Sequence, residues 1–521
     1  MRTCFGSCIA LLAGFMFSNG AHADTKLDAR QLTARIDRLV AQSWAKQGVR
    51  PAPLADDAEF FRRASLDLNG CIPSVAELRD FLDDRRVDKR RLWIDKLLDE
   101  ADHQKRYSRH FAAYWRRQIL AQAPPPMAAL APQFEDWLRG RFERNAPHRQ
   151  LVHDLLMARE TSAFYQAHEN KPENIAGAAA RLFLGLKLEC AQCHDDRSGG
   201  SWTQEQFWQT AAFFVPRSGQ LDIEVLTPYL SSSFEQQNGK GSIRLPGRDQ
   251  AVEGRFLDGK LPEWKDDLAP RQVFADWLVA RDNRWFARAT VNRVWHYLFG
   301  TGLVTPVNGF GSNDNPPSHP ELLDELARQF IASDFDMKFL LRALVSSRAY
   351  QLTSKQGQGT KALPRSFGRA ALRGMSPEQL YHSILQATGY LPASGASAER
   401  GLYGTSTPLD EFRRKFSDPR DEPAEVQASI QQALFLMNGK FIEQATSPEQ
   451  SPILKTVIES KAYRTVGRRI EALYLATLSR RPGSGELAEL VTYVESAPER
   501  GQALRDIFWS LLNSTEFVLV H

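Results

Sequence analysis

The sequence predicts a mainly α-helical protein in which two helical domains are joined by a short β-rich segment. Apolar residues recur at close to the 3.6-residue period of a helix along most of the chain. Residues 216–265 interrupt this pattern with short alternating stretches between glycines and prolines, which are typical of strands and turns. We therefore expect helical domains at residues 24–215 and 266–521, with the β-rich connection between them.

The first domain shows the helical pattern in several segments. They are residues 26–46, 74–82, 88–100, 103–120, 131–143, 148–160, 175–189 and 203–214. Ser74 with Glu77 three residues later forms a capping box, which marks a helix start. Residues 103–120 carry an aromatic stripe at helical spacing, which predicts a core-facing helix surface. The stripe consists of Tyr107, Phe111, Tyr114 and Trp115.

The second domain continues in the same manner. Helices are expected at residues 270–281, 286–299, 320–332, 336–349, 376–389, 425–437, 464–479, 484–495 and 501–513. Residues 390–406 are rich in Gly, Ser and Ala, and indicate a surface loop. His319 directly precedes Pro320 at a predicted helix start, which favours an N-terminal capping or turn role for this histidine.

The first residues have the features of a secretory signal peptide. Arg2 precedes an apolar run from Ile9 to Phe17, which is too short to span a bilayer, and Ala21 and Ala23 suit signal peptidase. We therefore expect residues 1–23 to be removed by cleavage after Ala23, and the mature protein to be periplasmic or secreted. No later run reaches about 18 apolar residues, so no transmembrane segment is expected.

The charges of the chain are nearly balanced, with 66 Lys and Arg against 62 Asp and Glu. A nucleic-acid-binding protein normally presents an excess of basic residues, so no nucleic-acid partner is expected. Two short basic clusters, Arg116–Arg117 and Arg413–Lys415, are flanked by acids or aromatic residues. We interpret both clusters as solvated helix faces.

Cleavage of the signal peptide would leave Cys71, Cys190 and Cys193 of the five cysteines. Cys190, Cys193 and His194 form the pattern Cys-x-x-Cys-His, in which two thiols attach haem c covalently and the histidine ligates iron. If the helix predicted at residues 175–189 continued through them, these three residues would share one helix face. Cys71 would then be a lone, buried thiol.

Several long strings resemble known families. The strings AEFFRRASLDLNGCIPSVAELRDFL and CAQCHDDRSGGSWTQEQFWQTAAFF resemble the planctomycete-type cytochrome c-like domain. Strings such as NRWFARATVNRVWHYLFGTGLVTPVNGFGSNDNPPSHPELLDELARQF and LLRALVSSRAYQLTS resemble its usual C-terminal partner, a helical domain of unknown function. Together the matching strings extend over nearly all of the mature chain.

The resemblance implies a covalent haem and suggests where a distal iron ligand could lie. His110 matches a histidine of the family pattern, and His296 and His319 lie in family-like strings. Met375 and Met437 are the methionine candidates, although Met437 lies in an apolar helical stretch typical of core. Two departures stand out. Asp196 occupies the place of a second histidine, and the cysteine pair that often follows the equivalent of EFRRKFSDPRDEP is absent.

We therefore expect an exported protein with one c-type haem at Cys190, Cys193 and His194. It would act in periplasmic electron transfer or in a haem-dependent redox step, with a redox or secreted protein as its partner. Two alternatives stay open from the residues. The first is a secreted binding or assembly protein in which Cys190 and Cys193 form a structural disulfide. The second is a metal-dependent hydrolase that uses His194 as a metal ligand with Asp195 and Asp196.

Overall fold

The structure of the protein is a computed structural model. It describes residues 26–121, 131–195, 202–215, 241–265, 268–311, 315–356, 365–392, 407–416, 435–437 and 439–521. These residues are mainly helical, which confirms the predicted class. The strands form two short antiparallel pairs, β1 (Ser242–Arg244) with β2 (Ala251–Glu253) and β3 (Arg373–Gly374) with β4 (Leu519–Val520). None of the described helices combines the length and the apolar character needed to cross a bilayer.

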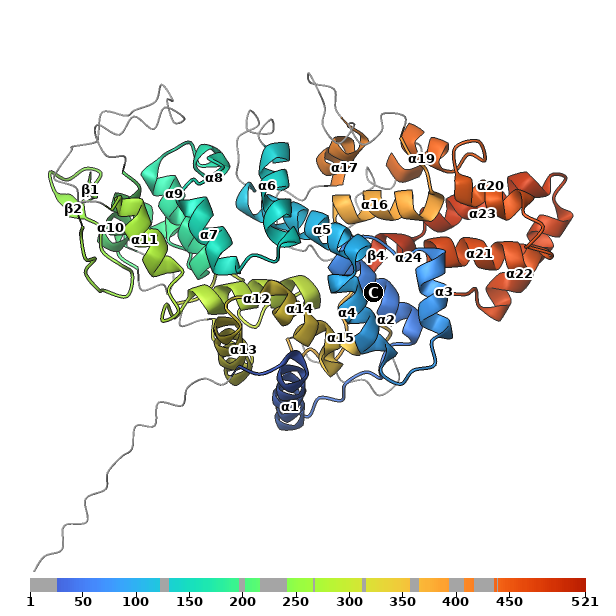
Figure 1. Ribbon diagram of the computed structural model, residues 1–521, viewed down its shortest axis with the longest axis horizontal. Helices are drawn as coiled ribbons and strands as arrows, with labels where there is room; N and C mark the ends of the chain where they lie inside the picture. The colour runs from blue at the N-terminus through green and yellow to red at the C-terminus, as the bar shows by residue number, and fades with distance from the viewer. Residues whose placement is uncertain are drawn as a thin grey trace, which may run out of the picture.

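The helices form an elongated molecule (Figure 1). Up to residue 214 they are α1 (Ala29–Gln47), α2 (Asp57–Asn69), α3 (Val75–Asp83), α4 (Lys89–Asp99), α5 (Ala101–Ile119), α6 (Ala131–Glu143), α7 (His148–Leu156), α8 (Ala163–Ala167), α9 (Pro172–Ala179), η2 (Ala180–Leu184), η3 (Glu189–Gln192), α10 (Gln204–Ala211) and η4 (Ala212–Phe214). From residue 270 they are α11 (Pro270–Leu278), α12 (Phe286–Phe299), α13 (Pro320–Ala332), α14 (Met337–Ser346), α15 (Arg348–Gln351), α16 (Pro377–Thr388), α17 (Pro408–Phe416), α19 (Lys440–Ala445), α20 (Pro452–Glu459), α21 (Val466–Thr477), α22 (Ser484–Ser496), α23 (Arg500–Leu512) and α24 (Thr515–Val518). Helices α9, α10 and α11 lie with β1 and β2 at one end, α21, α22 and α23 lie at the other, and α2 and α5 lie between them (Figure 1).

Local sequence signals place many helix ends correctly. Ser74 caps α3 through its hydroxyl oxygen, which accepts from the Glu77 amide at 3.2 Å, while the Glu77 carboxylate accepts from the Ser74 amide at 2.7 Å. His319 stands at the N-cap of α13 with Pro320 at the first helical position, as predicted. The aromatic stripe of α5 is buried in the core.

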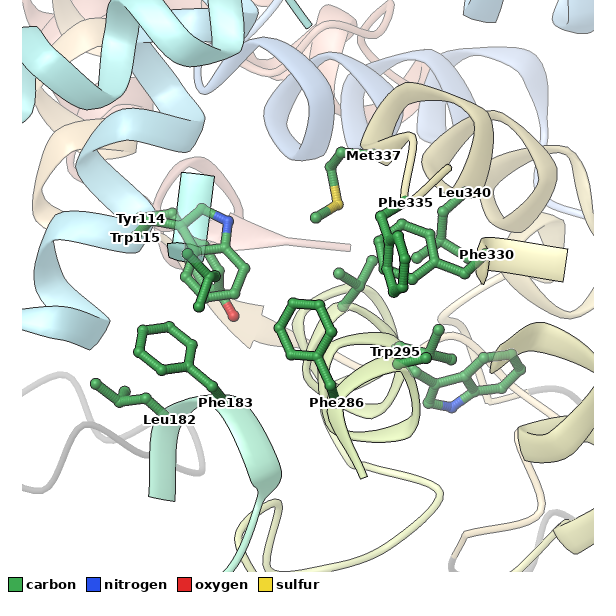
Figure 2. Packing of buried hydrophobic residues seen from close by; sticks show 14 of the residues in the cluster. Tyr114, Trp115, Leu182, Phe183, Phe286, Trp295, Phe330, Phe335, Met337 and Leu340 are labelled. Carbon is green, nitrogen blue, oxygen red and sulfur yellow. The ribbon is translucent and has the colours of Figure 1, made fainter. Parts of the chain in front are cut away.

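The apolar side chains form two separate cores. The larger core extends from Leu32 to Phe367 along the sequence, and the smaller one is built almost entirely from residues 380–520. Figure 2 shows side chains of α5, η2, α12, α13 and α14 meeting in the larger core. Leu475 belongs to the larger core and Leu66 and Ile72 to the smaller one, so the two cores interleave along the sequence.

The predicted β-rich connection is only partly described. Its described residues contain the hairpin of β1 and β2, in agreement with the strand signals of GSIRL and VEG. Ile243 and Val252 of this hairpin are buried in the larger core, so the segment is part of that core and does not bridge the two. The stretch LDIEVLTPYL, residues 1–23, residues 393–406 and most of the helix expected at 425–437 lie outside the described residues.

Helix α2 lies between the two cores and belongs to both. Phe60, Phe61 and Leu68 pack in the larger core, while Leu66 packs in the smaller one. Every residue from Glu59 to Asn69 is buried, including the charged ones. From Glu59 to Asn69 the polar face of α2 is therefore covered by other parts of the protein.

The prediction of solvated faces is wrong for Arg116, Arg117 and Arg413, which are half-buried in ion pairs, whereas Arg414 and Lys415 are exposed as expected. Arg116 Nη2 and Arg413 Nε both donate to Glu378 Oε1 at 2.9 Å, and Arg117 Nη1 lies 3.5 Å from Glu378 Oε2. Arg116 and Arg413 also lie 2.8 Å from Glu135. The reason is that α16 and α6 bring carboxylates to these cations, so that ion pairs replace their hydration.

Candidate functional site: the Cys190–His194 turn

Cys190 lies on the short 3₁₀ helix η3, and Cys193 and His194 follow it directly. The helix predicted at residues 175–189 does not reach them. Helix α9 continues as the π-helical turn η2 and ends at Gly185, whose φ of 67° lies in the left-handed region. A glycine in this conformation terminates a helix, so the expectation that the three residues share one face of a continuous helix is wrong.

Side chains of helix α10 hold the turn through hydrogen bonds to its backbone carbonyl oxygens. Gln204 Nε2 donates to the carbonyl oxygens of Gln192 at 3.3 Å and Cys193 at 3.1 Å, and Trp208 Nε1 donates to that of Gln192 at 3.0 Å. The backbone amide of Gln204 also donates to Asp195 Oδ1 at 2.8 Å. These bonds attach the middle of the Cys-x-x-Cys-His segment, and the Asp195 side chain that follows it, to one helix.

The other side of the turn contacts α9 and η2. Arg181 Nε donates to Glu189 Oε1 at 3.0 Å. The Glu189 side chain packs close to Gly177, where a Cβ would lie 3.1 Å from its Cγ. Arg293 of α12 donates to the Arg181 carbonyl oxygen at 3.3 Å, which connects this part of the turn to the larger core.

The three candidate ligands differ in exposure. Cys190 is half-buried, Cys193 is exposed, and both carry free thiols, as does the buried Cys71. His194 is exposed, and its Nδ1 lies 2.8 Å from the carbonyl oxygen of Asp195. A carbonyl oxygen only accepts hydrogen bonds, so Nδ1 carries the proton and, in the neutral ring, Nε2 carries the lone pair.

This donor set fits haem c. The two thiols lie three residues apart on one fixed turn, and the adjacent imidazole is oriented by a backbone carbonyl, as is usual for metal-ligating histidines. The residues that would hold the group are Cys190, Cys193 and His194. Cys193 and His194 are exposed, so the attachment point lies at the protein surface.

His110, the distal candidate on α5, has partners far from the turn in sequence. Its Nε2 lies 2.6 Å from the Tyr297 hydroxyl, which in turn donates to the Asp67 carbonyl oxygen at 2.8 Å. The ring lies against Gly70, where a Cβ would approach Nδ1 to 2.5 Å. Burial, with Arg117 nearby, lowers the pKa of His110 to about 3. The structure thus places His110 in a buried network that includes α2 and α12.

Of the other two distal candidates, His319 is buried and His296 is half-buried. His319 Nδ1 lies 3.0 Å from Ser318 Oγ, and its ring lies 5.3 Å from that of Phe367. Burial lowers the pKa of both His296 and His319 to about 4, with arginines nearby as the second cause. Among the described residues, neither ring, nor that of His110, makes a hydrogen bond or ring contact with a residue of the Cys190–His194 turn.

The methionine candidates lie in or beside the smaller core. Met375 is partly buried against that core, and its amide donates to the Val518 carbonyl oxygen at 3.0 Å. Met437 was expected in the core, but its side chain is 47% exposed. The prediction for Met437 is therefore wrong, because its helical segment packs through Leu436 instead.

The two alternative sites would use residues of the same turn. Cys190 and Cys193 are not joined in a disulfide here. Within the described ranges, no group of three or more His, Cys, Asp or Glu side chains gathers as a metal site would require. Asp196, a potential ligand beside His194, lies outside those ranges.

The charged residues of α2 are the feature that sequence reasoning missed. Arg62 donates to the carbonyl oxygens of Thr477 and Phe517, both at 2.8 Å, and Arg63 donates to that of Leu352 at 2.8 Å. Adjacent arginines therefore bind segments of different cores. A signal was present in the sequence, because FFRRASLDLN places polar residues between apolar ones on nearly every side of a helix. An amphipathic pattern alone, however, does not distinguish a solvated polar face from a buried one.

Two family models match the chain. Residues 35–218 match PSCyt2, a protein of unknown function (DUF1549), and residues 270–494 match PSD1, a protein of unknown function (DUF1553). The region that matches DUF1549 therefore precedes the region that matches DUF1553. This is the order that the resemblance implied, with the Cys190–His194 turn inside the DUF1549 region. The DUF1553 region contributes to both cores. No curated protein and no solved structure matches the chain.

Proposed function

We propose that the protein is an exported c-type haem protein that carries one haem on Cys190 and Cys193, with His194 as an iron ligand. It would act in periplasmic electron transfer or in a haem-dependent redox step. The observation that carries this proposal is the contact of His194 Nδ1 with the Asp195 carbonyl oxygen at 2.8 Å, beside two free thiols. It leaves Nε2 as the ligating nitrogen.

The rigidity of the turn supports the same function. A bound haem would supply an iron centre that exchanges one electron. Gln204 and Trp208 donate hydrogen bonds to backbone carbonyl oxygens of the turn. The thiols of Cys190 and Cys193 are both free. The exposure of Cys193 and His194 puts the attachment point where a redox or secreted protein partner can approach.

The decisive experiment is periplasmic expression with and without the cytochrome c maturation machinery, followed by a reduced pyridine haemochrome spectrum. We expect a c-type band only when the machinery is present. The double variant C190A/C193A should lose the band, while C71A, which removes the third thiol, should keep it. Absence of the band from the unmodified protein in the presence of the machinery would refute the proposal.

Thiol alkylation of the unfolded protein, read by intact mass, separates the alternatives. A haem protein should add one alkyl group, at Cys71, both with and without prior reduction, because thioether bonds resist reductants. A Cys190–Cys193 disulfide should give one group without reduction and three after it. Three alkyl groups both with and without prior reduction, together with a bound metal, would instead favour the metal-dependent hydrolase.

A further inference from the structure

A cleft of about 1080 Å³ lies where the two cores meet. Its lining comes from the start of α2, the end of α12, residues 354–356 and 365–372, and the segments around Leu478 and Leu519. Phe299 and Phe367 line it from the larger core, and Leu478 lines it from the smaller one. Clefts of this size between packed units are common sites for small molecules.

The acidic groups of the cleft are all engaged. Asp56 lies 3.5 Å from Lys355, and Glu516 accepts from Arg480 at 2.6 and 2.8 Å. Glu59, the third carboxylate, accepts from the Thr353 hydroxyl and the Ser354 amide, both at 2.7 Å, and lies 3.7 Å from the Arg63 guanidinium. These contacts pair Asp56 with Lys355 and Glu516 with Arg480, so all three acidic side chains of the lining are engaged. The lining also includes His521, the last residue of the sequence.

Three guanidinium groups of the lining make no ion pair with a carboxylate of a described residue, although Glu516 lies near enough to Arg62 to favour its charged form. Arg62 donates to the carbonyl oxygens of Thr477 and Phe517 and to the Ser479 hydroxyl, and Arg365 donates to the carbonyl oxygens of Leu303 and Pro316. The Nε of each is buried without an acceptor. Burial lowers the pKa of Arg62 to about 10, so it stays charged at neutral pH. Arg369 is exposed and makes no hydrogen bond or ion pair with any residue that the structure describes. The cleft therefore has a net positive lining.

The backbone that presents these groups is held in an unusual conformation. Arg365 and Phe367 have φ of 59° and 54°, a region that non-glycine residues rarely adopt. Between them, the Ser366 carbonyl oxygen accepts from Trp44 Nε1 at 2.7 Å, which ties the segment to α1. Strained backbone is retained where surrounding contacts enforce it, and it often accompanies a binding role. Here it places a cation and an aromatic ring on the same wall.

We propose that this cleft binds an organic anion, a molecule that carries a carboxylate or phosphate group on an apolar body. The anionic group would pair with Arg369 and Arg365 in the field of Arg62, because guanidinium groups bind both kinds of anion through charge-assisted hydrogen bonds. The apolar body would lie against Phe299 and Phe367. This site is separate from the Cys190–His194 turn and does not require haem.

Isothermal titration calorimetry of the full chain tests the site with four probes of matched shape or charge. They are 2-naphthyl phosphate, 2-naphthoate, the neutral 2-naphthol and inorganic phosphate. We expect both naphthyl anions to bind at least about fivefold more tightly than 2-naphthol and inorganic phosphate. The stronger of the two anions identifies the preferred head group. Equal affinity for 2-naphthol and the anions would overturn the proposal.

Variants of Arg369 locate the anion contact. Arg369 has no bond to lose, so R369Q should fold normally and bind the stronger anion about fivefold more weakly, with no change for 2-naphthol. R369K, which retains the charge, should recover most of the loss. R30Q removes the same charge from the exposed face of α1 and serves as the control. If R369Q and R30Q bind the anion alike, the proposed contact is wrong.

Discussion

Asp67 and Arg373 form an ion pair inside the protein, with Arg373 Nη2 donating to both carboxylate oxygens at 2.8 and 2.9 Å. The Asp67 side chain is fully buried, and that of Arg373 is 9% exposed. The Tyr350 hydroxyl adds a third donor to Asp67 at 2.8 Å, while Arg373 Nη1 donates to the Tyr297 carbonyl oxygen at 2.7 Å. The pair connects α2 to β3, where the two cores meet.

Removal of one partner of this pair should destabilise the protein strongly. D67N would leave the buried guanidinium of Arg373 without a counter-charge, and we expect a loss of about 3–5 kcal/mol in the free energy of unfolding, measured by urea denaturation. The double variant D67N/R373M removes both charges and should recover part of the loss. A double variant that loses the sum of the two single effects would show that the charges do not act as a pair.

Gly70 and Gly48 provide a matched test of packing. Both end a helix with positive φ, at 69° and 62°, but a Cβ on Gly70 would lie 2.5 Å from His110 Nδ1, whereas one on Gly48 would meet no atom within 4 Å. G48A should cost about 1 kcal/mol for the left-handed backbone alone. G70A should cost about 1–3 kcal/mol more, because His110 must move. Equal decreases in melting temperature in G48A and G70A would contradict the close contact between Gly70 and His110.

His148 should make stability depend on pH. Its ring is buried between Trp115 and Phe286, and burial, with Arg293 nearby, lowers its pKa to about 3. Between pH 6.5 and about 3 the unfolded state therefore binds a proton that the folded state does not, so stability falls as pH falls. H148F should remove about 1.4 kcal/mol per pH unit from that slope, as measured by urea denaturation at several pH values. An unchanged slope would show that His148 takes up a proton in the folded state.

Glu378 holds three arginines together, and its neutralisation should loosen the contact of α5 with α16 and α17. E378Q leaves Arg116, Arg117 and Arg413 facing one another with Glu135 and, at the rim, Asp410 as the remaining carboxylates, so we expect a loss of about 3 kcal/mol. The control E169Q breaks an exposed pair with Lys171 and should have little effect. Similar unfolding midpoints for E378Q and E169Q would mean that water solvates the three arginines well enough to replace the charge of Glu378.

The helices could be predicted from the sequence because their signals are local. The capping box of Ser74 and Glu77 and the proline after His319 act within one helical turn, and both mark real helix starts. The signal that ends a helix is equally local. The apolar period continues past Gly185 through Leu186 and Leu188 and predicts a longer helix, but the helix ends at Gly185. A left-handed glycine outweighs that period.

The candidate site was predicted as a set of residue types but not as a geometry. The spacing of Cys190, Cys193 and His194 is visible in the sequence, and it points to haem chemistry. The contacts that shape the turn come from Gln204 and Trp208 on a later helix. No periodicity within the turn itself contains that information, because the partners act from outside it.

By itself, the sequence determined the helical class, many helix ends, and the identity of the two thiols and the imidazole. These depend on backbone preferences and spacing within a few residues. Only the tertiary structure decided that the charges of α2 are buried between packed elements and that Arg116 and Arg413 are held in ion pairs. The reason is that an amphipathic helix has the same pattern whether its polar face meets water or the matching charges of residues hundreds of positions away, such as Arg373 opposite Asp67.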